Sequence, residues 1–192
     1  MMLKGILVHV DSSDSSEKRL ETAVYLAKSY DAHLIGLFVK YFAPIPDIPS
    51  PELIEQIFES QEKAPAKGAD KAEQMFYNAI GQEGVAGEWW CVTGDPVQQL
   101  ALHGRYVDTV TIGQNNPASD IEPGTYDLPD RLILSIGRPV ITIPYVINYP
   151  EIGKRVLVSR DASRLATRAV NEALKLLQLA DQVDVLAINP AG

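Results

Sequence analysis

The sequence predicts an α/β fold built on a doubly wound, mainly parallel β-sheet. Short apolar, β-rich runs such as residues 6–10 lack polar alternation, which is typical of strands covered on both faces. Amphipathic helical stretches separate these runs, and strand–helix alternation favours right-handed crossovers in a parallel sheet. Five such strands predict the order 3-2-1-4-5, with the winding reversing between the first and fourth strands.

The first half of the chain contains three of the expected strands, at residues 6–10, 34–39 and 89–92. After the first strand, a capping box that begins at Asp14 precedes a helix whose apolar residues share one face. A loop marked by four prolines follows the second strand, because proline fixes φ and removes a backbone donor. The helical pattern then covers residues 52–80, with a break or kink expected at residues 64–68.

The second half supplies the last two strands, at residues 110–112 and 140–143. Asp95 and Pro96 fit the N-cap and the first turn of a helix. Another helix opens at Pro129 and closes at Gly137, a residue type that readily adopts the left-handed conformation found at helix C-termini.

The composition excludes several classes of protein. Seventeen basic and twenty-five acidic residues give a formal net charge of -8, and such a surface repels nucleic-acid backbones and anionic membranes. A single cysteine, Cys91, cannot form an internal disulfide or a thiolate metal cage. The apolar runs are too short to span a membrane. We therefore expect a cytoplasmic protein with no nucleic-acid or membrane partner.

An internal repeat relates the two ends of the chain. Residues 4–39 and 154–189 align without a gap at an offset of 150. In each copy an aspartate follows the strand and a serine comes two residues later, at Asp11 and Ser13 and again at Asp161 and Ser163.

The repeat predicts the domain organisation. We interpret residues 1–148 as one α/β domain and residues 153–192 as the incomplete, strand–helix–strand opening of a second copy. Because about forty residues rarely bury enough surface to fold alone, this segment must pack on the first domain, on another chain or on a continuation.

Ligands of doubly wound sheets bind beyond the carboxyl ends of the strands, where the winding reverses. The residues that leave the first strand there are Asp11, Ser12 and Ser13, and residues 113–116 leave the fourth. An aspartate at this place can accept hydrogen bonds from a ribose or a base, and amides at a helix start can receive an anion. The same residues could instead only cap the following helix, and position alone leaves both interpretations open.

Four short motifs together resemble the universal stress protein family. They are Val-Asp-Ser at 10–12, Gly-Asp-Pro at 94–96, Ile-Gly at 112–113 and Gly-Arg-Pro-Val at 137–140. The resemblance extends to about Pro144, and the repeat from Gly153 resembles the start of a second domain, as in tandem members. It implies a Rossmann-like five-stranded fold, a homodimer and a role in the stress response, with ATP bound by many members and not by others.

ATP-binding members carry Gly, two residues, Gly, nine residues and then Gly-Ser or Gly-Thr, whose glycines let backbone amides approach phosphates. Here Gly113 matches the first glycine, but Asn116 stands at the second and Tyr126-Asp127 replaces the terminal pair. A carboxylate about 4 Å from a phosphate charge repels it by roughly 4 kcal/mol at an effective dielectric near 20, and Tyr126 would crowd the approach. We predict that this domain binds ATP weakly or not at all.

Some residues of the family's adenine side are retained. Asp11 and the backbone near Val39 match that side in the first domain, and Asp161 and Ser163 match the base and ribose positions in the second copy. An adenosine-like or other small polar ligand is therefore compatible with the sequence, although ATP or another adenine nucleotide is disfavoured as a cofactor.

The sequence contains no catalytic or metal-ligand set, and His9 and Cys91 are expected to pack in the core. The leading hypothesis is a non-catalytic stress-response protein that acts through dimerisation, with an unidentified downstream partner. The alternative is an ATP binder with slow hydrolysis, whose competent site a complete second domain supplies. A third is a pure interaction module with an empty pocket. The expected dimer rests on residues 140–143, an apolar terminal strand with an open edge.

Overall fold

The computed structural model of the protein describes residues 3–13, 15–42, 51–116, 124–146, 152–161 and 163–187, with the side chains of the long helix described from residue 67 onward. The capping box at Asp14, most of the proline loop and the linker before Gly153 lie outside the described residues.

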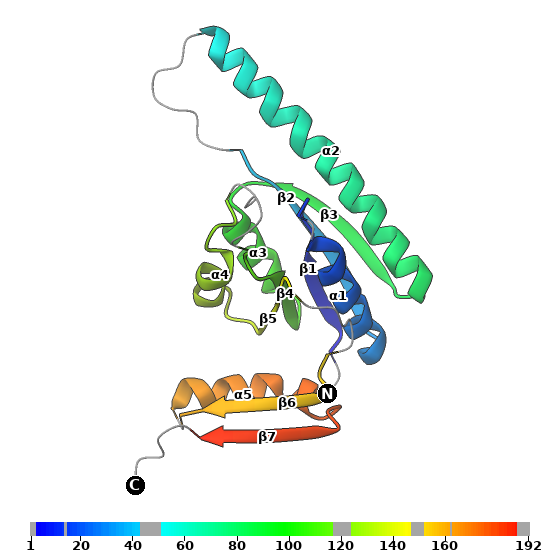
Figure 1. The fold of residues 1–192 in the computed structure, drawn as a ribbon, viewed down its shortest axis with the longest axis vertical. Helices are drawn as coiled ribbons and strands as arrows, with labels where there is room; N and C mark the ends of the chain where they lie inside the picture. The colour runs from blue at the N-terminus through cyan, green and yellow to red at the C-terminus, as the bar shows by residue number, and fades with distance from the viewer. Residues whose placement is uncertain are drawn as a thin grey trace.

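Strands and helices alternate along the chain. They are β1 (Gly5–His9), α1 (Ser16–Tyr30), β2 (His33–Lys40), α2 (Pro51–Glu83), β3 (Gly87–Thr93), α3 (Pro96–Gly104), β4 (Thr109–Gly113), α4 (Leu128–Ile136), β5 (Val140–Ile143), β6 (Arg155–Arg160), α5 (Arg164–Leu177) and β7 (Gln182–Ala187). The first five strands form one parallel sheet in the order β3-β2-β1-β4-β5, which confirms the predicted doubly wound fold. Helices α1 and α2 cover one face of this sheet, and α3 and α4 cover the other (Figure 1).

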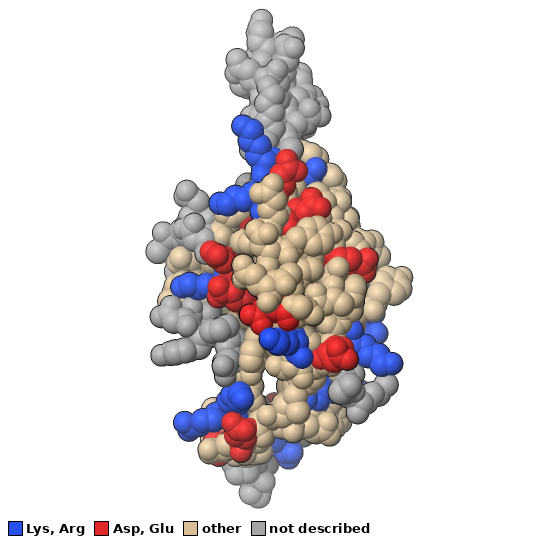
Figure 2. Space-filling view, turned by 90° about the vertical axis from the view of Figure 1, so that its right-hand side faces the viewer, with Lys and Arg blue, Asp and Glu red and all other residues tan. Residues whose placement is uncertain are grey.

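Residues 152–187, here called the C-terminal unit, form a strand–helix–strand element beside the main body. Its strands β6 and β7 pair in parallel in a separate two-stranded sheet. Helix α5 contacts the main body through Lys175, whose Nζ lies 2.8 Å from Asp108 Oδ1 and whose carbonyl accepts from the Tyr30 hydroxyl at 3.2 Å. Leu176 of α5 and Ile152 also pack against the main core. In space-filling view, the surface is hollowed where the unit meets the body (Figure 2).

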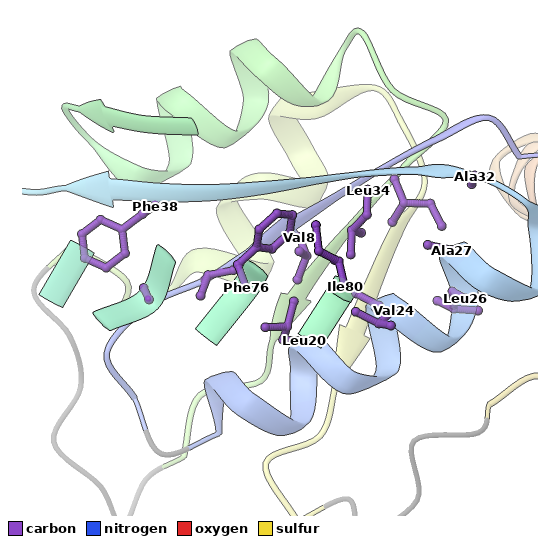
Figure 3. Packing of buried hydrophobic residues seen from close by; sticks show 14 of the residues in the cluster. Val8, Leu20, Val24, Leu26, Ala27, Ala32, Leu34, Phe38, Phe76 and Ile80 are labelled. Atoms are coloured by element: carbon purple, nitrogen blue, oxygen red, sulfur yellow. The ribbon is translucent and has the colours of Figure 1, made fainter. Parts of the chain in front are cut away.

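The main sheet is buried between two apolar layers. Val8 packs with Leu20 of α1 and Phe76 of α2 on one face (Figure 3), whereas Leu7 packs with Leu132 of α4 on the other. Consecutive residues of a strand point to opposite faces, so β1 is covered on both sides, as its unbroken apolar run predicts.

The start of α3 and the end of α4 lie where the sequence predicts them. The Asp95 carboxylate accepts a hydrogen bond from the Gln98 backbone N–H at 2.9 Å, with Pro96 in the first turn of α3. Helix α4 ends at Gly137, whose φ of 68° is the left-handed conformation that glycine adopts readily.

The break expected at residues 64–68 is wrong, because α2 is continuous from Pro51 to Glu83. The φ of proline is compatible with a helix, and the lost N–H removes a single intrahelical hydrogen bond. The turns that follow are held on the sheet by Ala69, Ala72 and Phe76, all of which are buried.

The expected core position of Cys91 is also wrong, since its side chain is exposed. Strand β3 lies at one edge of the five-stranded sheet, next to β2, and none of its residues is fully buried. His9, in contrast, is 3% exposed in the central strand, as expected of a packed residue.

Candidate functional site

The carboxyl ends of β1 and β4 lie side by side in the sheet, at the point where the winding reverses. Asp11 follows β1 and Gly113 ends β4, so the structure brings these two predicted site residues to one edge of the sheet.

Asp11 is buried, and its two carboxylate oxygens are already engaged. Oδ2 lies 2.7 Å from Nη2 of Arg19, and Oδ1 accepts hydrogen bonds from the backbone N–H and the hydroxyl of Ser13. The N-cap of α1 is Ser15, which makes no side-chain capping bond. Asp11 is therefore half of an internal ion pair, and each of its carboxylate oxygens already has a partner within the protein.

Arg19 is the residue that sequence reasoning missed. Its side chain is 3% exposed and also donates to the hydroxyl of Ser16 at 3.1 Å, and that hydroxyl in turn accepts from the Asp11 N–H. The available signal was its position four residues before Ala23, which places a charged residue on the buried face of α1.

Gly113 provides the space for this guanidinium. A Cβ at position 113 would overlap Nη1 of Arg19, so no larger residue fits without moving the arginine. The glycine that matches the first position of the phosphate loop thus has a structural explanation that involves no phosphate.

The electrostatics of the cluster favour the ion pair. Burial by itself would raise the pKa of Asp11, but Arg19, His9 and the Ser13 hydrogen bonds outweigh it and hold that pKa well below its usual range. Burial lowers the pKa of His9 to about 4, although Asp11, 3.7 Å away, opposes this. At neutral pH the cluster is therefore a neutral imidazole beside a carboxylate–guanidinium pair.

Two other predicted residues lie against helices of the main body. A Cβ added to Gly68 of α2 would lie 2.7 Å from the Ser12 hydroxyl, so Ser12 lies against α2. Val39 is buried in the layer formed by α3 and α4, which leaves only its backbone for a ligand.

The segment after β4 and the start of α4 lie together, as the motif spacing requires. The Asn115 side-chain amide donates to the carbonyl of Tyr126, next to the predicted residue Asn116. The Tyr126 side chain is 74% exposed, and Asp127 Oδ1 lies 3.5 Å from Nη1 of Arg131. Because Arg131 offsets the charge of Asp127, the expected repulsion of phosphate is weakened, and the Arg19 ion pair is the stronger obstacle.

The second pair of predicted residues lies in the C-terminal unit. Asp161 is exposed and accepts a hydrogen bond from the Ser163 N–H at 2.9 Å. Hydrogen bonding from the Ser163 side chain, and then from this N–H, lowers the pKa of the Asp161 carboxyl. The Ser163 hydroxyl caps α5 by accepting from the Ala166 N–H. Helix α5 docks near the amino ends of β1 and β4 through Asp108, so Asp161 and Asp11 are not brought into one site.

Within the described ranges, no group of three histidine, cysteine, aspartate or glutamate side chains could hold a metal ion. No helix in the same ranges has the length and apolar character needed to cross a membrane.

Comparison with known proteins places this geometry in a family. The sequence model of the universal stress protein family matches residues 2–116, and no curated protein matches the chain. The solved structure of UspA from Lactobacillus plantarum superposes with a TM-score of 0.60 at 20% identity, covering 74% of this chain and 99% of that one.

A second structure extends the similarity into the C-terminal unit. A universal stress protein from Archaeoglobus fulgidus DSM 4304 superposes with a TM-score of 0.65 at 20% identity and covers 94% of this chain. This chain spans 64% of that protein's length. Because the family model covers more than half of the sequence and the sheet order agrees, the chain belongs to the universal stress protein family.

Proposed function

We propose that the protein is a non-catalytic universal stress protein, acting in the cytoplasmic stress response through dimerisation rather than through ATP. One observation carries this proposal: both oxygens of Asp11 are engaged, one of them by the buried guanidinium of Arg19. Asp11 matches the adenine side of the family's nucleotide site, so the group that would receive a nucleotide already has an internal partner.

Displacing that partner is unfavourable. A ligand that replaces Arg19 as the partner of the Asp11 carboxylate must break a buried ion pair, which costs about 3–5 kcal/mol. Arg19 cannot compensate by binding phosphate, because its side chain is 3% exposed. A small polar ligand that uses only backbone groups at this edge avoids the cost, and such occupancy is the ligand binding that the proposal allows.

Equilibrium dialysis with radiolabelled ATP tests the proposal on the full 192-residue chain. We expect no saturation at millimolar ATP. A triple variant, Asn116→Gly with Tyr126→Gly and Asp127→Ser, restores the family's loop and is expected to remain unsaturated, because it leaves Arg19 in place. Micromolar saturable binding by the wild-type chain would overturn the proposal, and tight binding by the triple variant alone would place the cause in the loop.

The proposed homodimer uses the open edge of β5. The carbonyls of Pro139 and Ile143 accept from the backbone N–H groups of Val110 in β4 and of Gln114 just after it. The alternation of a parallel ladder therefore turns the backbone of Thr142 toward the open edge. Ile133 and Leu134 of the neighbouring helix α4 are 57% and 89% exposed, which adds apolar surface near this edge.

Thr142→Pro tests this edge, because proline removes the outward N–H without removing a bond to β4. We expect sedimentation velocity to show a dimer for the wild type and for Thr142→Val, and a monomer for Thr142→Pro. A wild-type chain that is monomeric at high concentration, or a Thr142→Pro chain that stays dimeric, contradicts the proposed interface.

A second candidate function is ATP binding with slow hydrolysis at a site supplied by a complete second domain. It is supported by Asp161, which is exposed and has no cationic partner within the described residues, unlike Asp11. If residual ATP binding or hydrolysis is detected, its loss in Asp161→Asn but not in Asp11→Asn favours this candidate.

A further inference from the structure

A cavity of about 510 Å³ separates the main body from the C-terminal unit. Helix α1 contributes Tyr25, Leu26 and Tyr30 to one wall, and Val156 of β6 and Leu177 of α5 contribute to the other. This cavity lies at the amino ends of the central strands, away from Asp11 and Gly113, and Figure 2 shows the surface hollowed at the same boundary.

The contacts that fix α5 leave this space open. Lys175 is held by Asp108 and by the Tyr30 hydroxyl, and Arg168 donates to the Gly137 carbonyl at 3.2 Å. Leu176 also packs against the main core, where Leu26 and Tyr30 are already buried. The remaining space is bordered by side chains that stay partly exposed, among them Tyr25, Val156 and Leu177. The volume is within the range of small-molecule sites, which are mostly apolar with a few polar groups that orient the ligand.

The charged residues in the described lining of the cavity are both basic. Among the described residues, no acidic residue lines this cavity, whereas Lys154 and Arg155 both do. Both cations are exposed, and neither forms an ion pair within the described residues. A largely apolar space whose described lining carries two cations and no carboxylate favours an amphipathic anion over a neutral or cationic ligand.

We propose that this cavity binds a long-chain fatty acid. Its hydrocarbon chain lies between α1 and α5, against the partly exposed Tyr25, Val156 and Leu177, where burial removes apolar surface of both partners from water. Its carboxylate meets Lys154 and Arg155, which form charge-assisted hydrogen bonds with it. The site is separate from the nucleotide position discussed above and does not depend on the proposed function.

Displacement of the fluorescent fatty acid cis-parinarate from the delipidated full chain tests the ligand class. Three competitors share a saturated chain and differ in the head group: myristate, myristyl alcohol and the cation tetradecyltrimethylammonium. We expect myristate to displace the probe. The alcohol should need about a tenfold higher concentration for the same displacement, and the cation a higher concentration still. Equal displacement by all three, or failure of the probe to bind, overturns the proposal.

Matched variants test the placement of the ligand. The double variant Lys154→Gln with Arg155→Gln should bind myristate about tenfold more weakly while binding the alcohol as before, and Arg160→Gln, on the same strand but outside the lining, should leave both unchanged. Ala173→Phe should fill the cavity and abolish binding, whereas Ala169→Phe on the same helix should not.

Ala173→Phe could also disturb the packing of α5, so the double variant Lys154→Gln with Arg155→Gln provides an independent test. A double variant that binds myristate as tightly as Arg160→Gln overturns the proposal. The ATP dialysis experiment is unaffected by either result, so failure of this site is distinguishable from failure of the proposed function.

Discussion

The unit β1–α1–β2 and the unit β6–α5–β7 share a sequence pattern but differ in what surrounds them. Leu7 is fully buried in the centre of a five-stranded sheet, whereas its counterpart Leu157 is 65% exposed in a two-stranded one. The strand–helix–strand pattern therefore specifies local structure in both places, while burial depends on the elements that pack around it.

The turn after the first strand has the same local structure in both units but a different environment. The Asp11 carboxylate accepts from the Ser13 N–H at 3.0 Å, and the Asp161 carboxylate accepts from the Ser163 N–H at 2.9 Å. Only Asp11 has an ion-pair partner, Arg19, within the described residues. The same turn therefore forms in both units from the local sequence. The two aspartates differ in that Asp11 is buried and paired with Arg19, whereas Asp161 is exposed to solvent.

The largest expected effect comes from making the first unit resemble the second at this position. Arg19→Ala introduces the residue found at the counterpart position 169 and leaves the Asp11 carboxylate buried without its cation. We expect the free energy of unfolding in urea to fall by about 3–5 kcal/mol. Arg168→Ala removes an exposed arginine of α5 and should change it by less than about 1 kcal/mol. An Arg19→Ala chain as stable as Arg168→Ala would contradict the importance of the pair.

The buried imidazole of the first unit makes stability depend on pH, and its counterpart in the second unit is a serine. The pKa of His9 is lowered from 6.5 to about 4, so between these values the unfolded state binds a proton that the folded state does not. Stability is therefore fully present above the unfolded pKa and falls as the pH drops, by about 3 kcal/mol down to the folded pKa. At lower pH the depressed pKa of Asp11 acts in the same direction.

Urea unfolding measured at several pH values checks this dependence. His9→Gln should remove the loss of stability that occurs between the unfolded and folded pKa values of His9. His33→Gln, which changes an exposed histidine, should retain this loss. A wild-type stability that is flat over this range would show that His9 is protonated in the folded protein.

Gly113→Ala should be less severe than Arg19→Ala, because the arginine can shift. The added Cβ overlaps Nη1 of Arg19, and overpacking of this kind costs about 1–3 kcal/mol. In the Arg19→Ala background the same change should cost less, which a double-mutant cycle measures. Gly81→Ala, where the new Cβ meets nothing, should instead stabilise α2 by about 0.5–1 kcal/mol. A Gly113→Ala cost that is equal in both backgrounds would contradict the overlap with Arg19.

The contrast also explains which features could be predicted from sequence. The sheet order and the cap at Asp95 follow from periodicity and from contacts within a few residues. The exposure of Cys91 could not be predicted, because it depends on which strand forms the edge and how far the helices cover it. The inward turn of Arg19 and the contact of Lys175 with Asp108 arise from packing, which a pattern of apolar residues does not specify.

The smallest expected effects come from two helix caps, one in each region. Asp95 caps α3 through the Gln98 N–H at 2.9 Å, and Ser163 caps α5 through the Ala166 N–H at 3.1 Å. Replacing either residue by alanine should lower the stability of its helix by about 1 kcal/mol, because a backbone N–H in the first turn loses its hydrogen-bond acceptor.

The two caps should nevertheless be detected by different measurements. Helix α3 carries Leu100 into the core, so Asp95→Ala should lower the urea midpoint of the whole protein. None of the described residues of α5 is buried, so Ser163→Ala should speed amide hydrogen exchange in α5 and leave that midpoint unchanged. If both variants lower the midpoint equally, the C-terminal unit unfolds together with the main body, and the contacts of Lys175 and Leu176 with that body couple the two regions more strongly than the exposure of α5 suggests.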